Sequence, residues 1–465
     1  MIQDAGFTFM ADVFPEDFWW GVATSAYQIE GSASADGRGR SVWDVFCRTP
    51  GRVWGADSGD IACDHYRRLE EDVHLMRDLG VGHYRFSISW PRVMPDGRGT
   101  VNERGIDFYD RLTDMLLAHG ITPHATLFHW DSPQALEDRY GSWRSREIAH
   151  DFARYCSAVA RRLGDRISRW MTINEIRCFT HMGYGVNETP PHAPGTVLGS
   201  RKELLQTVHH ALLAHGLGCQ AIRSSSPGRC HIALADNFDA YVPIAETPDH
   251  IEAARRAFVG EHYNGSILVP AITGHYGQAA LADLGADAPD IQPGDMEIIG
   301  QPLDALGFNV YTGHYVRAAD NPRGYEVLTM PADYPRMGMP WLHFLPESLY
   351  WGARMVRDAL DKKDLPIFIS ENGCSCDDAP TATGEIIDSG RILYTRAYLR
   401  SVLRAIDDGL PLIGYFHWSL MDNFEWSYGR SKRFGLVHVD RSTQKRTPKQ
   451  SFHWYREVIR KNRIV

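Results

Sequence analysis

The chain lacks the features that mark several large classes of protein. It has no tract of lysine and arginine, and its 49 basic and 58 acidic residues leave a net charge of −9, which argues against nucleic acid as a partner. A long uncharged stretch, Leu204–Ile222, contains glutamine and histidine, so it indicates an amphipathic helix rather than a membrane span. The N-terminus has no basic segment followed by an apolar one, so no secretory signal is expected.

Cysteine is present without the spacing of a disulfide framework or a metal site. Eight cysteines are scattered along the chain, which is typical of reduced thiols and predicts a cytoplasmic protein. Cys374 and Cys376 form a C-x-C pair, but nothing nearby completes a zinc site. The Gly-rich phosphate motifs of nucleotide-binding folds are also missing, so neither a cofactor nor a metal is expected.

Aromatic residues, in contrast, are plentiful. The 13 Trp, 20 Tyr and 19 Phe make up 11% of the chain. Aromatic side chains fill hydrophobic cores, but they also form the flat walls of ligand sites. The sequence therefore has material for both.

Eight short, β-rich apolar runs alternate with longer amphipathic stretches, and no low-complexity linker interrupts them. The runs are Phe18–Ser25, His83–Trp90, Thr122–Trp130, Ser168–Glu175, Cys230–Phe238, Ala305–Thr312, Pro366–Glu371 and Leu412–Leu420. The helical stretches are Asp64–Leu79, Ile106–His119, Arg146–Leu163, Leu204–Ile222, Ile251–His262, Pro346–Leu360, Arg391–Asp407 and Gln450–Arg460. This α/β alternation predicts one (β/α)₈ barrel domain over residues 1–465, with its core at about 14–460 and long loops at the carboxyl ends of the strands. A doubly wound open sheet is the competing fold.

In such a barrel the functional residues lie where the strands end. Polar and aromatic residues stand at or just beyond these ends: Gln28, Glu30, Arg85, Trp90, His129, Trp130, Asn174, Glu175, Asn309, Tyr311, Glu371, Asn372, His417, Trp418, Glu425 and Trp426. A strand core has no reason to end repeatedly in carboxylates, amides and indoles. We therefore expect a polar ligand at this end of the barrel.

Glu175 and Glu371 each follow an apolar run directly, on strands four and seven, which we expect to face each other across the barrel. Most enzymes that cleave glycosides use two carboxyl groups that flank the scissile bond. One protonates the leaving oxygen, while the other attacks the anomeric carbon or activates a water molecule. The alternative is that each is a surface residue or a partner in a buried ion pair.

A sugar presents hydroxyl groups at its edge and C–H groups on its faces, so its site needs polar side chains beside aromatic planes. Gln28, His129, Asn174 and Glu425 could supply the first, and Trp130, Trp341, Trp418 and Trp426 the second. Any single Trp would more often belong to the core, but four at strand ends or in the following loops, beside polar partners, favour a ligand wall.

Six segments resemble the motifs of glycoside hydrolase family 1, in the order of that family. They are residues 14–31, 84–90, 172–175, 369–373, 418–426 and 433–437. The resemblance implies a retaining β-glucosidase, with Glu371 as the nucleophile and Glu175 as the general acid/base. It further implies that Arg85 and Tyr311 bond to Glu371, that Asn174 holds the sugar 2-hydroxyl, and that a small β-glycoside is the partner. The residues that it implies for substrate binding are Gln28, His129, Trp130, Asn174, Trp341, Trp418, Glu425, Trp426 and Phe434.

The chain departs from the family pattern directly after Glu175. Most relatives continue with Pro-Trp, whereas this chain has Ile176 and Arg177. With His181 and His343, Arg177 suggests a cationic leaving-group side and hence an anionic aryl aglycone of the salicylate type. The alternative is that Arg177 points to solvent or pairs with a nearby carboxylate. The loop of Trp341 is also one residue longer than usual, which weakens the assignment of this Trp.

Two rival functions stay open at this stage. A non-catalytic sugar-binding barrel would be expected to lack one of the two carboxylates, and both are present. A transglycosylase would use the same covalent intermediate, and acceptor affinity rather than any motif separates it from a hydrolase. The polar set suits glucose, and relatives that carry it also accept galactose or fucose.

Overall fold

The computed structural model describes residues 12–260 and 263–465. Eight parallel strands form a closed barrel in which each strand pairs with the next along this series. They are β1 (Trp19–Ala23), β2 (His83–Ser87), β3 (Thr122–Phe128), β4 (Arg169–Asn174), β7 (His231–Asp236), β9 (Ala305–Asn309), β12 (Ile367–Asn372) and β13 (Leu412–Trp418). Seven of them lie within an apolar run and β12 extends one residue beyond its run, so the predicted (β/α)₈ barrel is confirmed.

The barrel closes where β1 pairs with β13, so strands from near the two ends of the chain lie side by side. The contact is close, since a Cβ added to Gly21 would lie 2.4 Å from the Phe416 ring. The interior at the amino ends of the strands is filled by rings in edge-to-face and tilted contacts that include Trp19, His124, Phe368 and Phe416. Part of the aromatic content therefore belongs to the barrel core.

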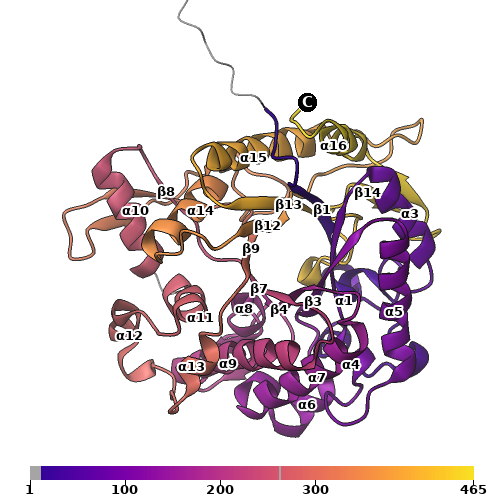
Figure 1. Cartoon of the computed structure of the whole chain (residues 1–465), viewed down its shortest axis with the longest axis horizontal. Helices are drawn as coiled ribbons and strands as arrows, with labels where there is room; N and C mark the ends of the chain where they lie inside the picture. Colours follow the sequence, from indigo (N-terminus) through magenta and orange to yellow (C-terminus); the bar gives the residue numbers. More distant parts are fainter. Residues whose placement is uncertain (1–11, 261–262) are drawn as a thin grey trace, which may run out of the picture.

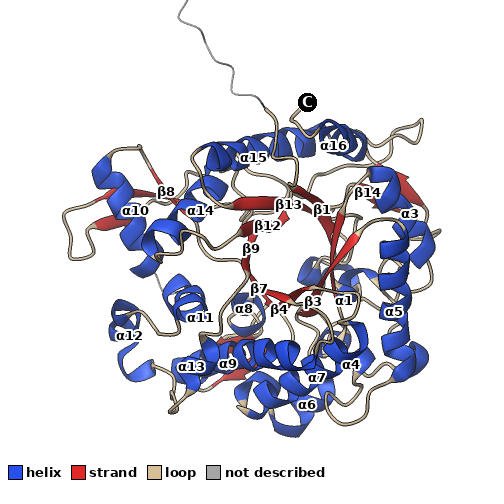
Figure 2. Cartoon of the chain, in the orientation of Figure 1, coloured by secondary structure: helices blue, strands red, loops and turns tan. Residues whose placement is uncertain are grey.

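Long helices surround the strands, as Figure 2 shows in blue around the red ring. They are α3 (Leu69–Leu79), α5 (Glu103–Ala118), α7 (Glu147–Leu163), α9 (Arg201–Ser225), α10 (Pro248–Gly260), α14 (Glu347–Ala359), α15 (Ser389–Asp407) and α16 (Gln450–Lys461). Helix α7 illustrates the amphipathic pattern, because its buried residues Ile148, Phe152, Tyr155 and Val159 recur three or four positions apart. The predicted end of the fifth helix, at residues 261–262, lies outside the described residues.

Several short elements in the loops are absent from the sequence-based prediction. The short helices are α1 (Ala26–Ile29), α2 (Val42–Phe46), α4 (Trp90–Val93), α6 (Gln134–Tyr140), α8 (Ile176–Thr180), α11 (Val269–Thr273), α12 (Gln278–Leu284) and α13 (Asp295–Ile299). The short strands are β5 (Tyr184–Val186), β6 (Thr196–Leu198), β8 (Tyr241–Pro243), β10 (His314–Ala318), β11 (Tyr325–Val327), β14 (Val437–Val439) and β15 (Arg446–Pro448). Strands β8, β10 and β11 make a small sheet beside α10 and α14, outside the barrel (Figure 1).

Helix α9 contains the long uncharged stretch and is packed against α7. Over residues 12–260 and 263–465, no helix has both the length and the apolar character that crossing a bilayer requires. All eight cysteines are unbridged.

Candidate active site

The carboxyl ends of β4, β9 and β12 bring two carboxylates into one hydrogen-bond network. Glu175 directly follows β4, and Glu371 lies within β12. These strands are not diametrically opposite, as the sequence suggested, because only β7 and β9 lie between them on the shorter way around the barrel. Asn309, the last residue of β9, spans this gap: its amide donates to Glu175 Oε1 at 2.8 Å and to Asn174 Oδ1 at 2.9 Å.

Glu371 is held by a cation and a phenol. Arg85 Nη1 donates to Glu371 Oε1 at 2.5 Å, and the Tyr311 hydroxyl donates to Oε2 at 2.8 Å. Arg85 and Glu371 are 1% and 3% exposed, so their attraction is poorly screened by water. Burial raises the pKa of Glu371, whereas the charge and hydrogen bond of Arg85 and the Tyr311 hydroxyl favour its ionised form.

Glu175 has a different set of partners. It is buried and receives hydrogen bonds from Asn309 and from the Cys178 thiol, both neutral donors. Burial, followed by the charge of Glu371, raises the pKa of Glu175 to about 8. At neutral pH one carboxyl is therefore set up to hold a proton, while its neighbour is paired with a guanidinium.

Asn174 links the two carboxylates to the sugar-binding candidates. Its Oδ1 accepts hydrogen bonds from Arg85 at 2.5 Å and from Asn309 at 2.9 Å, and its Nδ2 lies 3.1 Å from His129 Nε2. The Trp130 indole donates to the Asn174 carbonyl at 3.0 Å. Both ends of the amide are thus fixed, so its orientation is set before any ligand arrives.

An aromatic wall stands beside this network. The His129 ring stacks on Trp418 and on Trp426, with centroids 5.8 and 6.0 Å apart, and Trp130 packs against Trp426 at 4.5 Å. The three indoles are 4–7% exposed. Burial, with a smaller contribution from the charge of Arg85, moves the pKa of His129 well below its usual range, so this ring is neutral.

The backbone is strained at three positions of the site. Trp130, Glu175 and Trp426 have φ values of 75°, 49° and 51°, in the left-handed region that large side chains avoid. Each such residue costs about 1–3 kcal/mol, and the surrounding packing has to offset it. Strain of this kind clusters at functional sites, where it orients a side chain.

Gln28 and Glu425 form a polar pair at the edge of the wall. Gln28 Nε2 donates to the Phe424 carbonyl at 2.8 Å and to Glu425 Oε2 at 3.3 Å. Burial and the charge of Glu371 raise the pKa of Glu425 to about 8, so Glu425 lies within the electrostatic reach of the network. Two further candidates lie beside Tyr311. Trp341 is 43% exposed, with its ring 5.9 Å from the Tyr311 ring, and Phe434 is buried at 6.3 Å.

The leaving-group candidates are arranged less compactly than the sequence suggested. Arg177 Nη1 donates to Asp239 Oδ1 at 2.9 Å, and its guanidinium lies 3.5 Å from the Tyr263 ring centroid. The ring of His181 packs edge-on against the same Tyr263, whereas His343 packs against Tyr334 in another loop. Ile176 is buried in the hydrophobic core. Arg177 therefore has the carboxylate partner that the alternative interpretation anticipated, and Asp239 balances its charge.

Two residues of the site were missed by the sequence analysis. Asn309 was noted at a strand end but received no role, although its position on the strand before Tyr311 is a usable signal. Asp239 gave no signal, because it is 62 residues from Arg177 and follows a different strand.

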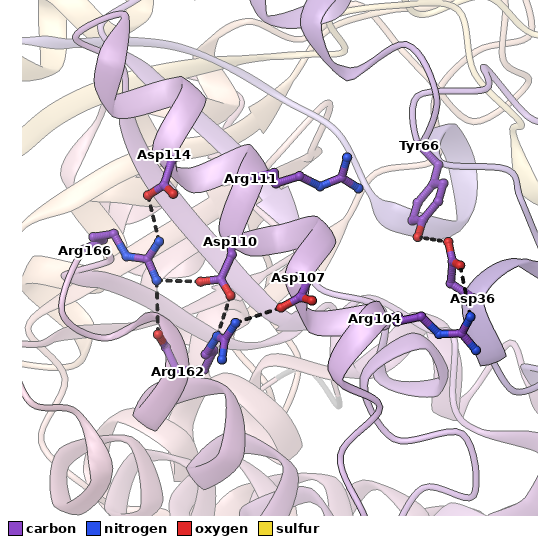
Figure 3. Close-up of a pocket in the computed structure, with 9 residues that line it drawn as sticks. All are labelled: Asp36, Tyr66, Arg104, Asp107, Asp110, Arg111, Asp114, Arg162 and Arg166. Carbon is purple, nitrogen blue, oxygen red and sulfur yellow. Dashed lines mark hydrogen bonds and ion pairs between the residues drawn. The ribbon is translucent and has the colours of Figure 1, made fainter.

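A hollow on the outer wall of the barrel is unrelated to this site. It lies over α5 and α7, and Figure 3 shows its charged side chains bonded mainly to one another. Arg162 of α7 and Arg166, just beyond the end of α7, bind Asp107, Asp110 and Asp114 of α5. With these charges already paired, we assign the hollow no function.

The comparisons with known proteins agree with this geometry. The model of glycosyl hydrolase family 1 matches residues 10–464. A 1,4-beta-D-glucan glucohydrolase of Thermotoga neapolitana is 42% identical over 456 residues, which are 97% of this chain and 99% of that protein. A beta-glucosidase of an Agrobacterium species is 44% identical over 460 residues, with 96% and 95% covered.

Solved structures agree as well. The beta-glucosidase of Thermotoga maritima in complex with glucoimidazole is 40% identical and superposes with a TM-score of 0.87, covering 97% of this chain and 99% of that one. The match of the family model over nearly the whole chain, together with these relatives, shows that the chain belongs to glycosyl hydrolase family 1.

Proposed function

We propose that this protein is a retaining β-glucosidase that hydrolyses terminal β-D-glucosides through a covalent glycosyl-enzyme. The observation that carries the proposal is the contrast between its two carboxyl groups. Arg85 and Tyr311 hold Glu371, whereas Glu175 has neutral donors and a pKa raised to about 8. A retaining glycosidase needs this division between an ionised nucleophile and a protonated acid.

In the first step, Glu371 attacks the anomeric carbon while Glu175 gives its proton to the leaving oxygen. The glycosyl ester that forms carries no charge on Glu371. Because that charge helps to raise the pKa of Glu175, its loss makes Glu175 more acidic and suits it to act as a base toward water. Asn174 would bond the sugar 2-hydroxyl, and the hydrogen bonds of its amide oxygen to Arg85 and Asn309 support this role because they fix its orientation.

The sugar itself would lie against the wall of Trp418, Trp426 and His129, with Gln28 and Glu425 bonding its hydroxyl groups. The names of the relatives support glucose as the sugar. With its pKa raised to about 8, Glu425 can donate to one sugar oxygen and accept from another.

A finer part of the proposal concerns the leaving group. The exposed Trp341 favours a flat aryl aglycone. An anionic one, bound by Arg177, has weaker support because Asp239 already pairs this guanidinium. We keep this preference as a proposal that comparison of neutral and carboxylated substrates can test.

Azide rescue tests the two catalytic roles separately. With an aryl glucoside that has a good leaving group, Glu371→Gly should be inactive, and azide should partly restore turnover to give the α-glucosyl azide. Glu175→Gly should form its glycosyl-enzyme normally, and azide should give the β-glucosyl azide, because attack then occurs on the opposite face. Exchange of the two products would reverse the roles, and full activity in Glu371→Gly would contradict the mechanism. Product analysis with an added alcohol separates hydrolysis from transglycosylation.

A further inference from the structure

The segment that follows Glu371 contains two thiols that the proposed reaction does not use. Cys374 and Cys376 lie with their Sγ atoms 3.9 Å apart. Cys374 is fully buried, whereas Cys376 is partly exposed and precedes the exposed Asp377. A small reagent from solvent therefore reaches Cys376 first and finds a second sulfur directly behind it.

The surroundings of the two thiols make them chemically different. The hydrogen bond from Cys374 lowers the pKa of Cys376, and the charge of Arg391 acts in the same direction against burial. Burial raises the pKa of Cys374. The accessible sulfur is thus the one that more readily becomes a thiolate, the form that reacts with oxidants, and its buried neighbour stays a thiol.

Hydrogen bonds of Arg391 connect the thiol segment to the segment that contains Phe434, at the carboxyl end of the barrel. This guanidinium is fully buried and donates to the backbone carbonyls of Cys374 and Phe434, with the carboxylates of Asp378 and Asp388 as its counter-charges. The Cys376 amide donates to the Arg433 carbonyl at 3.1 Å, beside Phe434.

The residue before the first thiol has no room to move. A Cβ on Gly373 would lie 1.9 Å from the carbonyl oxygen of Trp418, so the backbones of these two residues are in direct contact. Glu371 is two positions earlier. A change in the geometry of the thiol segment is therefore passed to both the carboxylate and the sugar wall.

We propose that Cys374 and Cys376 are an oxidation site, at which a hydroperoxide converts the two thiols into a disulfide and thereby lowers the activity of the enzyme. The Cys376 thiolate attacks the terminal peroxide oxygen, the O–O bond breaks, and a sulfenic acid forms with release of hydroxide from hydrogen peroxide or of an alkoxide from an organic hydroperoxide. The Cys374 sulfur then attacks the Cys376 sulfur, the S–O bond breaks, and the Cys374 proton leaves with the hydroxyl group as water. Two electrons pass from the thiols to the peroxide.

The disulfide would lower the activity by displacing the neighbouring catalytic groups, without contacting the sugar itself. A sulfur–sulfur bond is about 2.05 Å long, so the two side chains must approach from 3.9 Å while Arg391 and Gly373 hold the backbone. Displacement of a catalytic group by about 1 Å costs about a hundredfold in rate.

The test treats the reduced, full-length protein with hydrogen peroxide. We expect the loss of two thiols per chain, a mass lower by two hydrogens, and a fragment map that places the bond between Cys374 and Cys376. We also expect kcat/KM on an aryl β-glucoside to fall about a hundredfold and to recover with dithiothreitol. The activity measurement rests on the proposed function, whereas the thiol count and the fragment map do not, so the two can fail separately.

Variants identify the sulfur atoms involved. Cys376→Ser should keep its basal activity and resist peroxide, while Cys230→Ser, which removes another partly exposed thiol just before β7, should lose activity like the parent. Cys374→Ser should stop at a sulfenic acid on Cys376 that dimedone traps, and if it fails to fold, the map of the parent protein decides. Free thiols after peroxide treatment, or a Cys374–Cys376 disulfide with undiminished kcat/KM, would overturn the proposal.

Discussion

On the sugar side of the barrel end, nearly every candidate residue is buried and in contact with another candidate. Asn174 alone contacts Arg85, Asn309, His129 and Trp130. On the leaving-group side, Trp341 is 43% exposed, and Arg177 bonds a carboxylate that belongs to no catalytic network. Under the proposed function, such a site would fix the sugar through the scaffold and leave the aglycone to residues that can be exchanged at little cost.

The largest loss of activity is expected when Arg85, on the sugar side, is replaced. In Arg85→Met, Glu371 loses its buried cation, and removal of one partner of such a pair costs about 2–5 kcal/mol, or roughly 30- to 5,000-fold in kcat/KM. The pKa of Glu371 should rise, so the acid limb of the pH profile should move to higher pH. The alkaline limb, set by Glu175 with its pKa of about 8, should remain: activity requires its protonated form and is lost as the pH rises through that value.

Arg85→Lys is the matched control, because it keeps the charge and loses the second hydrogen bond to Asn174. In Arg85→Lys, the acid limb of the pH profile should lie between those of the parent protein and Arg85→Met. Thermal unfolding of both variants separates a loss of fold from a loss of function. An unchanged acid limb in Arg85→Met would mean that this guanidinium does not control the ionisation of Glu371.

Removal of one indole from each side should have smaller effects on activity than the loss of Arg85, and the two effects should differ. Trp426 is 5% exposed and packs on Trp130, so Trp426→Ala should raise KM about 10- to 100-fold for every β-glucoside, the equivalent of burying one large apolar side chain. Trp341→Ala should cost less than about fivefold, since a half-exposed ring has less apolar surface to lose, and the cost should vary with the aglycone. Equal effects on all substrates would remove the distinction between the sides.

The two sides also differ in how far the sequence predicts them. The strand-end rule located Arg85, Asn174, Glu175 and Glu371, because each follows or lies within a short apolar run whose position in the barrel is set by its neighbours. The β8–β10–β11 sheet was missed, since β8 and β11 have only three residues each and are too short to show a period. Loop residues such as Asp239 pair across distances that no local pattern encodes.

Arg177 also illustrates what the sequence alone does not predict. The sequence predicts a departure from the family pattern at Arg177, where a Trp is expected. What that arginine can bind depends on Asp239, which the three-dimensional structure supplies. The sequence therefore gives the position of the expected difference, whereas the Arg177–Asp239 ion pair weakens the case for an anionic aglycone.

The smallest expected effect concerns that ion pair. Arg177→Ala should lower kcat/KM by about threefold on a carboxylated aryl β-glucoside and leave the matched neutral substrate unchanged, because Asp239 already uses much of the charge. Asp239→Asn is the sharper variant. It keeps the size of the side chain, removes the competing carboxylate, and should raise the preference for the carboxylated substrate. The double variant should lose that gain, since the gain requires the guanidinium. If Asp239→Asn changes both substrates equally, Arg177 serves only to hold the loop that carries Tyr263, and the anionic aglycone is the wrong substrate class.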